Sequence, residues 1–294
     1  MRITSQMMVN NFVANLHRNL AELNKEYEKL ASGKKFQRPG DDPSGVTRSM
    51  TLQAKLLENA QYARNIDEAL AIFETSEIAL NNVSSVLARA RDLTIRAGGL
   101  LADEDRGAIA KEVSGLIQQL VAAGNVSSGT KYVFGGKKVG TVPFQTSGDS
   151  VVYVGTTDVP EFEISPYVRM KAGVSGHEVF YLDDDTSLFD VLKSLEEALV
   201  SNPETIDDCI GSLDRAIDHV LRYRAEIGAK YNHLTNVKER LKDIETNLKA
   251  LLSNNEDTDI AETIMQAKTK ENVYTASLAT GARIIQPSLV DFLR

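Results

Sequence analysis

Apolar side chains recur near both ends of the chain at alternating spacings of three and four residues, a pattern typical of a helix that buries one face. Near the start, the recurring positions are Val9, Val13, Leu16, Leu20, Leu23, Tyr27 and Leu30. Near the end, they are Ile260, Ile264, Ala267, Tyr274, Leu278 and Ile285. A chain end is usually poorly ordered unless a partner holds it. The two patterns therefore predict that the first and last helices pair with each other and with copies from other subunits.

Two long helices are expected between these ends. One runs from about 46 to 97 and carries two adjacent apolar rows, so it should pack against two partners inside a bundle. The other keeps an apolar repeat from Ile206 to Leu251, which corresponds to about 70 Å of helix. Its apolar residues at 231, 234 and 237 are three residues apart twice in succession. This predicts a stammer, which is a local overwinding of the coiled coil. Arg224 interrupts the apolar face of this second helix.

Turn-forming residues separate the first helix from the second. Gly33 can end the first helix in the left-handed conformation, and Lys34 and Lys35 suit the negative helix end. Arg38 to Gly45 read RPGDDPSG, which breaks any helix. Ser44 is the expected N-cap of the next helix.

Shorter helices and breaks complete the helical part. A third helix is expected to end near Ala123, and a fourth to begin at Ser187 and end before Asn202-Pro203. Ser253-Asn254-Asn255 is expected to break the long helix. Acidic residues at 257 to 259 suit the positive start of the final helix.

Residues 129 to 181 differ in character, because β-branched and aromatic residues alternate there with Gly, Pro, Ser and Asp. This predicts short antiparallel strands near 131–134, 150–154, 161–164 and 178–181. The expected fold is mainly α: an elongated antiparallel helical bundle or coiled coil formed by both chain ends, with a small inserted antiparallel β unit. The expected regions are a terminal assembly region (1–33 and 256–294), a helical bundle (44–130 and 186–253) and the β unit (131–185).

Composition narrows the range of partners. The chain has 294 residues, 42% of them hydrophobic, and a net charge of -8. The size allows a substantial core, and the negative charge disfavours binding to nucleic acid or to an anionic membrane. No apolar run approaches the roughly 20 residues that a spanning helix needs. The chain also opens without the pattern of a cleaved signal peptide, so we expect it to be cytosolic or exported without one.

Metal and cofactor sites are not expected. The four histidines do not pair at the spacing that zinc-binding helices use; they are His17, His177, His219 and His233. Asp183-Asp184-Asp185 lacks the alternating ligands and closing glutamate of a calcium loop, which favours a solvated turn. The single cysteine, Cys209, excludes an intramolecular disulfide and a multi-cysteine zinc site.

No segment has the context of a catalytic motif. Gly173–Gly176 and Gly135–Lys138 resemble a nucleophile elbow and a phosphate loop in composition only, and both favour turns. Arg89, Arg91 and Arg96 lie near acidic residues, which favours a salt-bridged bundle surface over a basic binding patch. An enzyme is therefore the least supported class, and no catalytic residue is predicted.

Several short motifs together resemble the flagellin superfamily of bacterial flagella. They are Met1-Arg2-Ile3-Thr4 with Met7, Leu30–Lys34, Asp41-Asp42-Pro43, Tyr132–Gly136 with Pro143-Phe144, Asp257–Glu262 and Ser288–Phe292. Within the superfamily, the start and finish of the chain are most similar to members that form the hook-filament junction. The motifs cover both chain ends, and the superfamily says least about residues 137 to 185.

This resemblance implies an extracellular structural protein of the flagellum, exported unfolded through the flagellar type III apparatus. It implies self-assembly into a ring layer between a neighbouring hook-associated protein and flagellin, and a cytosolic export chaperone that binds the C-terminal helix. The expected assembly interface comprises Val13, Leu16, Leu20, Leu23, Tyr27, Leu30, Ile260, Ile264, Tyr274, Leu278, Ile285, Leu289 and Phe292.

Two other functions fit the same patterns. The chain could be a flagellin, the filament subunit, which shares the fold class and differs in the neighbours that it meets. It could also be a cytosolic coiled-coil adaptor, and secretion into the medium by a motile strain would separate that function from the flagellar ones. The two terminal helices are expected to be mobile in the free subunit and to order on assembly.

Overall fold

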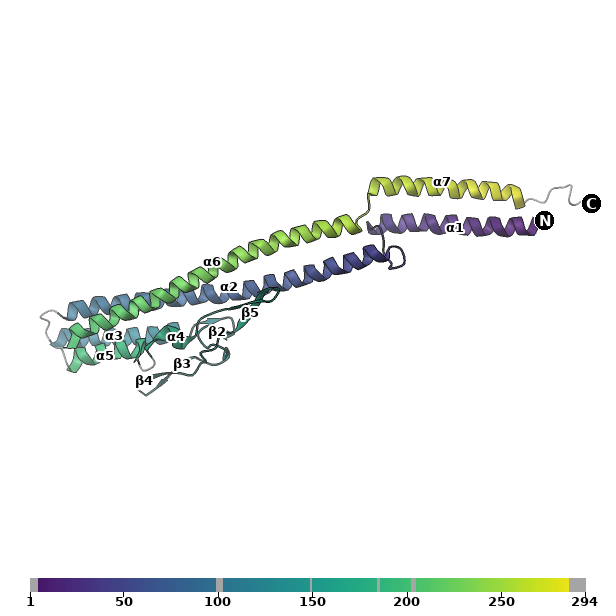
Figure 1. Cartoon of the computed structure of the whole chain (residues 1–294). Helices are drawn as coiled ribbons and strands as arrows, with labels where there is room; N and C mark the ends of the chain where they lie inside the picture. Colours follow the sequence, from purple (N-terminus) through teal and green to yellow (C-terminus); the bar gives the residue numbers. More distant parts are fainter. Residues whose placement is uncertain (1–4, 99–102, 149, 184–185, 202–204, 286–294) are drawn as a thin grey trace, which may run out of the picture. The chain divides into compact units, whose positions relative to one another are not determined.

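We describe residues 5–98, 103–148, 150–183, 186–201 and 205–285 of the computed structural model. Helices dominate this part of the chain (Figure 1). They are α1 (Ser5–Ser32), α2 (Pro43–Ala97), α3 (Asp103–Gly124), α4 (Gly176–Phe180), α5 (Leu188–Ser201), α6 (Ile206–Glu256) and α7 (Ile260–Ile285). The predicted mainly helical fold with a small antiparallel β part is confirmed. Within this part of the chain, no helix is long and apolar enough to cross a membrane.

The chain forms two compact units. The terminal unit contains residues 1–57 and 245–294, and the central unit contains residues 58–244. Helices α2 and α6 contribute residues to both units. The three functional regions predicted above divide the chain differently and remain a prediction.

In the central unit, α2 and α6 bury apolar residues at seven-residue intervals, as a coiled coil requires. The fully or almost fully buried rows are Ile66, Phe73, Leu80 and Leu87 on α2, and Leu213, Val220, Ile227, Leu234 and Leu241 on α6. The predicted stammer is wrong, because Tyr231 is 38% exposed and the buried row passes from Ile227 to Leu234 without it. Helices α3 and α5 pack against each other beside these rows.

In the described residues, the β part consists of four antiparallel hairpins, each a separate two-stranded sheet. The pairs are β1 (Ser127–Ser128) with β2 (Lys131–Tyr132), β3 (Phe144–Ser147) with β4 (Ser150–Tyr153), β5 (Glu161–Ser165) with β6 (Val168–Lys171), and β7 (Tyr181–Asp183) with β8 (Thr186–Ser187). Three predicted strands thus coincide with β2, β4 and β5, while β1, β3, β6 and β8 were not predicted. Of the acidic run after β7, Asp184 and Asp185 lie outside the described residues.

The predicted strand at 178–181 is wrong, because this segment is mostly helix α4. Ser175 and Glu178 form a capping box: the Ser175 side chain accepts from the backbone of the first turn, and Glu178 accepts from the Ser175 N–H. The short helix buries Phe180 among Phe134, Phe144 and Phe189, with ring centroids 4.7 to 5.6 Å apart. The alternating apolar pattern therefore reflects one buried helical turn.

Two helix boundaries in the terminal unit also differ from expectation. Asp42, and not Ser44, caps α2: its Oδ1 accepts from the N–H groups of Ser44 at 3.1 Å and Gly45 at 3.0 Å. Pro43 at the first helical position suits this arrangement. Helix α6 continues through the expected break to Glu256, because the Asn255 amide donates to the Gly45 carbonyl at 2.9 Å and holds the last turn.

Candidate assembly surface

Helices α1 and α7 lie side by side and antiparallel in the terminal unit (Figure 1). The paired positions run in opposite directions along the chain: Phe12 meets Gly281, and Asn19 meets Ser277. Further toward the end of α1, Glu22 pairs with Lys270. The predicted pairing of the first and last helices is confirmed.

The seam of α1 is mostly apolar and follows the heptad rule. Its buried or half-buried positions step by three and four: Val9, Phe12, Leu16, Asn19, Leu23, Glu26 and Leu30. The predicted residues Leu16, Leu20, Leu23 and Leu30 all lie on or beside this seam, half-buried or buried. Phe12 was not predicted to lie on the seam, because Val9 and Val13 already fitted the heptad spacing of apolar residues.

The seam of α7 differs from the predicted one, because small and polar residues occupy it. Its buried or half-buried positions are Thr263, Ala267, Lys270, Glu271, Tyr274, Ser277 and Gly281. Of these positions, only Ala267 and Tyr274 belong to the predicted apolar row. A Cβ on Gly281 would lie 2.3 Å from a ring carbon of Phe12, so any larger residue at this position would force the Phe12 ring to move. The physical reason for the miss is that close helix contact selects small side chains, which an apolar pattern does not detect.

Polar pairs fix the register of the two helices. The Asn19 amide donates to the Ser277 hydroxyl at 3.1 Å. Lys270 donates to the Glu22 carboxylate, and this hydrogen bond holds the pKa of Glu22 below its ordinary value. Polar groups at a seam disfavour other registers, because a shifted helix would leave them without partners.

Large apolar side chains remain exposed on both helices. On α1 they are Met7, Met8, Val13 and Tyr27, and on α7 they are Ile260, Ile264, Met265, Val273 and Leu278, each between 38% and 64% exposed. Five predicted interface residues belong to this set: Val13, Tyr27, Ile260, Ile264 and Leu278. Leu289, Phe292 and the Ile285 side chain lie outside the described residues. So many exposed apolar side chains on two helices are typical of an interaction surface.

The Asp257–Glu262 motif starts α7. Asp259 caps the helix, because its Oδ1 accepts from the N–H groups of Ala261 at 2.9 Å and Glu262 at 3.1 Å. The Thr263 hydroxyl donates to the Asp259 carbonyl at 2.7 Å. The acidic start predicted for this helix is therefore confirmed, with Asp259 as the cap.

A clasp of backbone and side-chain bonds joins the α1–α2 loop to the α6–α7 loop. Gly33 ends α1 with a φ of 71°, as predicted, and its carbonyl accepts from the Thr258 N–H at 2.9 Å. Lys34 forms an antiparallel bridge with Asp257, and the Lys35 N–H donates to the Glu256 carbonyl at 2.6 Å. The two connecting loops therefore position the start of α7 beside the end of α1.

Glu256 is the buried centre of this clasp, with only 6% of its surface exposed. Its carboxylate accepts from Lys34 Nζ at 2.6 Å and from Gln53 Nε2 at 3.1 Å. Burial alone would raise the pKa of Glu256, but the hydrogen bonds from Lys34 and Ser49 outweigh it and hold that pKa below its ordinary value. The carboxylate is thus charged and paired at neutral pH.

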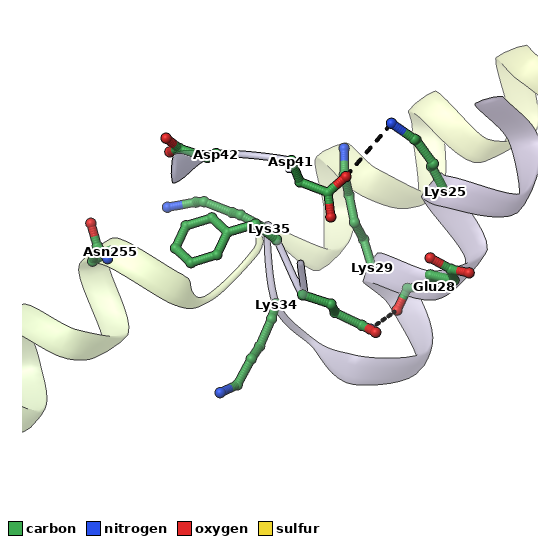
Figure 2. Close-up of a pocket in the computed structure, with 10 residues that line it drawn as sticks. Lys25, Glu28, Lys29, Lys34, Lys35, Asp41, Asp42 and Asn255 are labelled. Atoms are coloured by element: carbon green, nitrogen blue, oxygen red, sulfur yellow. Dashed lines mark hydrogen bonds and ion pairs between the residues drawn. The ribbon is translucent and has the colours of Figure 1, made fainter. Parts of the chain in front are cut away.

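A pocket of about 320 Å³ lies next to the clasp (Figure 2). Lys25, Lys29, Lys34 and Lys35 line it together with Glu28, Asp41 and Asp42. Lys25 Nζ lies 3.6 Å from Asp41, and Gln37 donates to the Glu28 carbonyl at 3.2 Å. The lining is a network of mixed charge with polar partners, which suits a structural junction.

The other motifs singled out in the sequence are structural as well. Gly135–Lys138 forms a turn, with the Lys138 N–H donating to the Gly135 carbonyl at 3.2 Å and Gly136 at a φ of 64°. Arg89 pairs with Asp92 and Glu112, and Arg91 with Asp214, as expected of a salt-bridged surface. Arg224 pairs with Glu77 across α2 and α6.

This chain is similar to proteins of bacterial flagella. The family "Bacterial flagellin N-terminal helical region" matches residues 3–138. The Flagellar filament 30.7 kDa core protein of Treponema maltophilum is 30% identical, over 85% of this chain and 84% of that protein. Flagellar hook-associated protein 3 of Salmonella typhimurium is 26% identical, over 95% of this chain and 96% of that protein.

Solved structures share the fold. The putative flagellar hook-associated protein from Vibrio parahaemolyticus has a TM-score of 0.68 at 20% identity, covering 74% of this chain and 100% of that one. FlgL of Xanthomonas campestris has a TM-score of 0.63 at 17% identity, covering 69% of this chain and 99% of that one. With a relative 30% identical over most of both chains, this protein belongs to the flagellin superfamily of bacterial flagellar proteins.

Proposed function

We propose that this protein is the structural subunit of the bacterial flagellum that joins the hook to the filament by self-assembly into a ring layer. Its similarity to hook-associated protein 3 along 95% of the chain supports this function. The observation that carries the proposal is the set of exposed apolar side chains on α1 and α7. A chain that exposes them at both ends of its sequence gains stability when neighbouring subunits cover them.

The mechanism is coupled folding and assembly. The α1/α7 pair is held by one apolar seam on α1, small residues on α7 and a few polar bonds, so a free subunit buries little apolar surface there. Contacts with neighbours bury Val13, Ile264 and Leu278 and convert a weak helix pair into part of a layer. Head-to-tail contacts between identical chains build rings or helices, which fits a tubular structure.

A filament subunit is the second candidate, because a filament core protein is 30% identical to this chain. The two functions differ in the neighbours that the terminal helices meet. Polymerisation separates them: long filaments grown from this protein alone favour a filament subunit, whereas assembly only in the presence of hook-associated protein and flagellin favours the junction.

The proposed route to the flagellum is export without a cleaved signal peptide through the type III apparatus, after a cytosolic chaperone has covered α7. Exposed apolar residues on α7, such as Ile260 and Met265, support this route, because a bound chaperone would shield them from water before assembly. Mass spectrometry of the protein from the medium of a motile strain tests the route. An N-terminus trimmed by tens of residues would contradict export without cleavage.

The decisive experiment deletes the gene and re-expresses the chain in the same strain. We expect cells without the gene to carry hooks and to shed filament protein into the medium, and re-expression to restore attached filaments. A deletion strain that keeps attached filaments of normal length would contradict the junction function. A strain that no longer makes filament protein would point to the filament subunit.

A further inference from the structure

The methionines of the described residues are unevenly exposed in the two units. Those of the terminal unit are each more than half exposed: Met7 at 56%, Met8 at 51%, Met50 at 66% and Met265 at 64%. Met170, in the central unit, is half-buried and packs against the apolar core. The methionines most accessible to a solute in water therefore lie in the terminal unit.

Met7 and Met265 face away from the seam between α1 and α7. An α-helix has 3.6 residues per turn, so two residues that are two positions apart lie on nearly opposite sides. Met265 is two positions from the seam residues Thr263 and Ala267. Met7 is likewise two positions from Val9 of the α1 seam. Pairing of the two helices therefore leaves both methionines uncovered in the free subunit.

An exposed methionine reacts with a peroxide. The O–O bond breaks, one oxygen forms a bond to the sulfur, the sulfur is oxidised by two electrons, and hydrogen peroxide is thereby reduced to water. The single cysteine does not compete, because Cys209 is buried and burial raises the pKa of its thiol. A thiol that stays protonated is a poor nucleophile. Peroxide is thus expected to act on the exposed methionines of the free chain.

Oxidation changes the surface that α1 and α7 present to a neighbour. A thioether is apolar, whereas a sulfoxide carries a polar oxygen, and covering that oxygen without a donor weakens a contact by about tenfold. We propose that Met7, Met8 and Met265 are reversible oxidation sites through which a peroxide prevents the free subunit from joining the ring layer. This inference rests on the proposed function, in which neighbouring subunits cover the exposed apolar residues of α1 and α7.

Hydrogen peroxide applied to the purified, unassembled chain tests the modification itself. Peptide mapping by mass spectrometry follows the gain of one oxygen atom at each methionine. We expect Met265 to be oxidised while most of Met170 is unchanged, and methionine sulfoxide reductases A and B to restore the thioether. Oxidation of Met170 as fast as Met265, or a sulfoxide at Met265 that the reductases do not remove, would overturn the proposal.

Substitutions test the effect on assembly. Glutamine imitates the sulfoxide, because it is polar and carries an acceptor oxygen, whereas leucine keeps the surface apolar and cannot be oxidised. Both favour a helix about as well as methionine, so α1 and α7 should form in either variant. In the deletion strain, we expect the chain with Met7→Gln, Met8→Gln and Met265→Gln to leave about tenfold more filament protein shed than the chain with leucine at the same positions.

Met50→Gln is the matched control. Met50 is as exposed as Met265 and lies in the same unit, but it belongs to α2 and not to the α1/α7 surface. We expect this variant to restore attached filaments as the unaltered chain does. Shed filament protein is compared at matched amounts of each exported variant, and circular dichroism checks that the helices are retained.

The outcomes separate the inference from the proposed function. If the unaltered chain fails to restore attached filaments, the proposed function is wrong. If the unaltered chain restores them and the glutamine chain does so as well as the leucine chain, the inference is wrong. If Met50→Gln causes an equal loss, the loss reflects any polar substitution, and the inference is again wrong. If only the glutamine chain sheds filament protein, the inference is supported.

Discussion

At the scale of single residues, the unusual positions are those where a side chain is missing or a polar group is buried. Gly281 allows Phe12 to contact the backbone of α7, and Glu256 places a paired carboxylate under the clasp. Neither could be predicted from hydrophobic periodicity, because their roles depend on residues more than 200 positions away in the sequence. By contrast, Gly33 was predictable, because a glycine directly after a helix is itself the local signal.

Gly281→Leu should separate α1 from α7. The added side chain would overlap the Phe12 ring, and overpacking of this kind typically costs about 1 to 3 kcal/mol. We expect faster amide exchange along 5–32 and 260–285, measured by mass spectrometry, with unchanged exchange in the central unit. Ala279→Leu is the control, because Ala279 is exposed on the same helix. Equal exchange in both variants would contradict the role of Gly281.

His219 should make the central unit less stable at acidic pH. Its Nδ1 lies 2.9 Å from Arg222, which can only donate, so Nε2 carries the proton and donates to the Glu178 carbonyl at 2.9 Å. Burial lowers the pKa of His219 below its ordinary value near 6.5. Protonation is thus easier in the unfolded chain, and stability present above about pH 6.5 is lost as pH falls through the lowered pKa.

Urea unfolding of the central unit between pH 8 and pH 5 measures this effect. His219→Gln serves as the control, because glutamine can still donate to a carbonyl and does not titrate in this range. We expect the decline in stability with falling pH to be smaller in the variant. Identical pH profiles for the two proteins would show that His219 does not contribute.

At the scale of elements, periodicity predicted the helices where heptads are regular and apolar, as on α2 and α6. It failed where the seam is made of small residues, as on α7, and where a helix is too short to show a period, as in α4. The capping box at Ser175 and Glu178 is a local signal that could have identified α4. On α7, Ile260, Ile264 and Leu278 are exposed and lie off the seam with α1, and their contact with neighbouring subunits remains a prediction.

The clasp between the two loops is expected to determine whether α7 stays beside α1. Lys34→Met removes the cation that pairs with Glu256 and leaves a buried carboxylate with fewer partners. Such a loss typically costs about 1 to 3 kcal/mol. We expect a lower melting temperature for the terminal unit, monitored by a fluorescent label on α7.

A charge-matched control distinguishes this effect from a general loss of positive charge. Lys268→Met removes a lysine of α7 whose carboxylate partner, Glu271, is on the same helix. This exposed pair should contribute little. If both variants melt at the same temperature, the clasp does not hold the helix pair.

At the scale of the whole molecule, the two units differ in how their cores are built. The central unit buries long apolar rows and an aromatic cluster, whereas the described part of the terminal unit buries mainly Leu23, Leu52 and small or polar residues. The mainly helical fold could be predicted from the sequence because each long helix carries its own period. The division near residues 57 and 245 could not, because α2 and α6 continue through it without a break in helix pattern.

Because of this difference, we expect the terminal unit to be less stable against unfolding than the central unit. We expect residues 5–32 and 260–285 to exchange their amide protons faster than the buried rows of α2 and α6, since few apolar contacts protect them. Hydrogen exchange on the purified, unassembled protein measures the contrast. Full protection of both terminal helices in the free subunit would contradict coupled folding and assembly. Protection that appears only after assembly would support it.

The four hairpins of the described β part form separate two-stranded sheets, so no ladder of backbone hydrogen bonds runs from one hairpin to the next. Lengthening one turn therefore leaves the hydrogen bonds of the other three intact, and the helices that carry the heptad rows need not move. The turn that joins β3 to β4, next to Gly148, is a natural point for inserting a peptide epitope or an affinity tag. A protein built in this way can change the surface it displays without changing the parts by which it assembles.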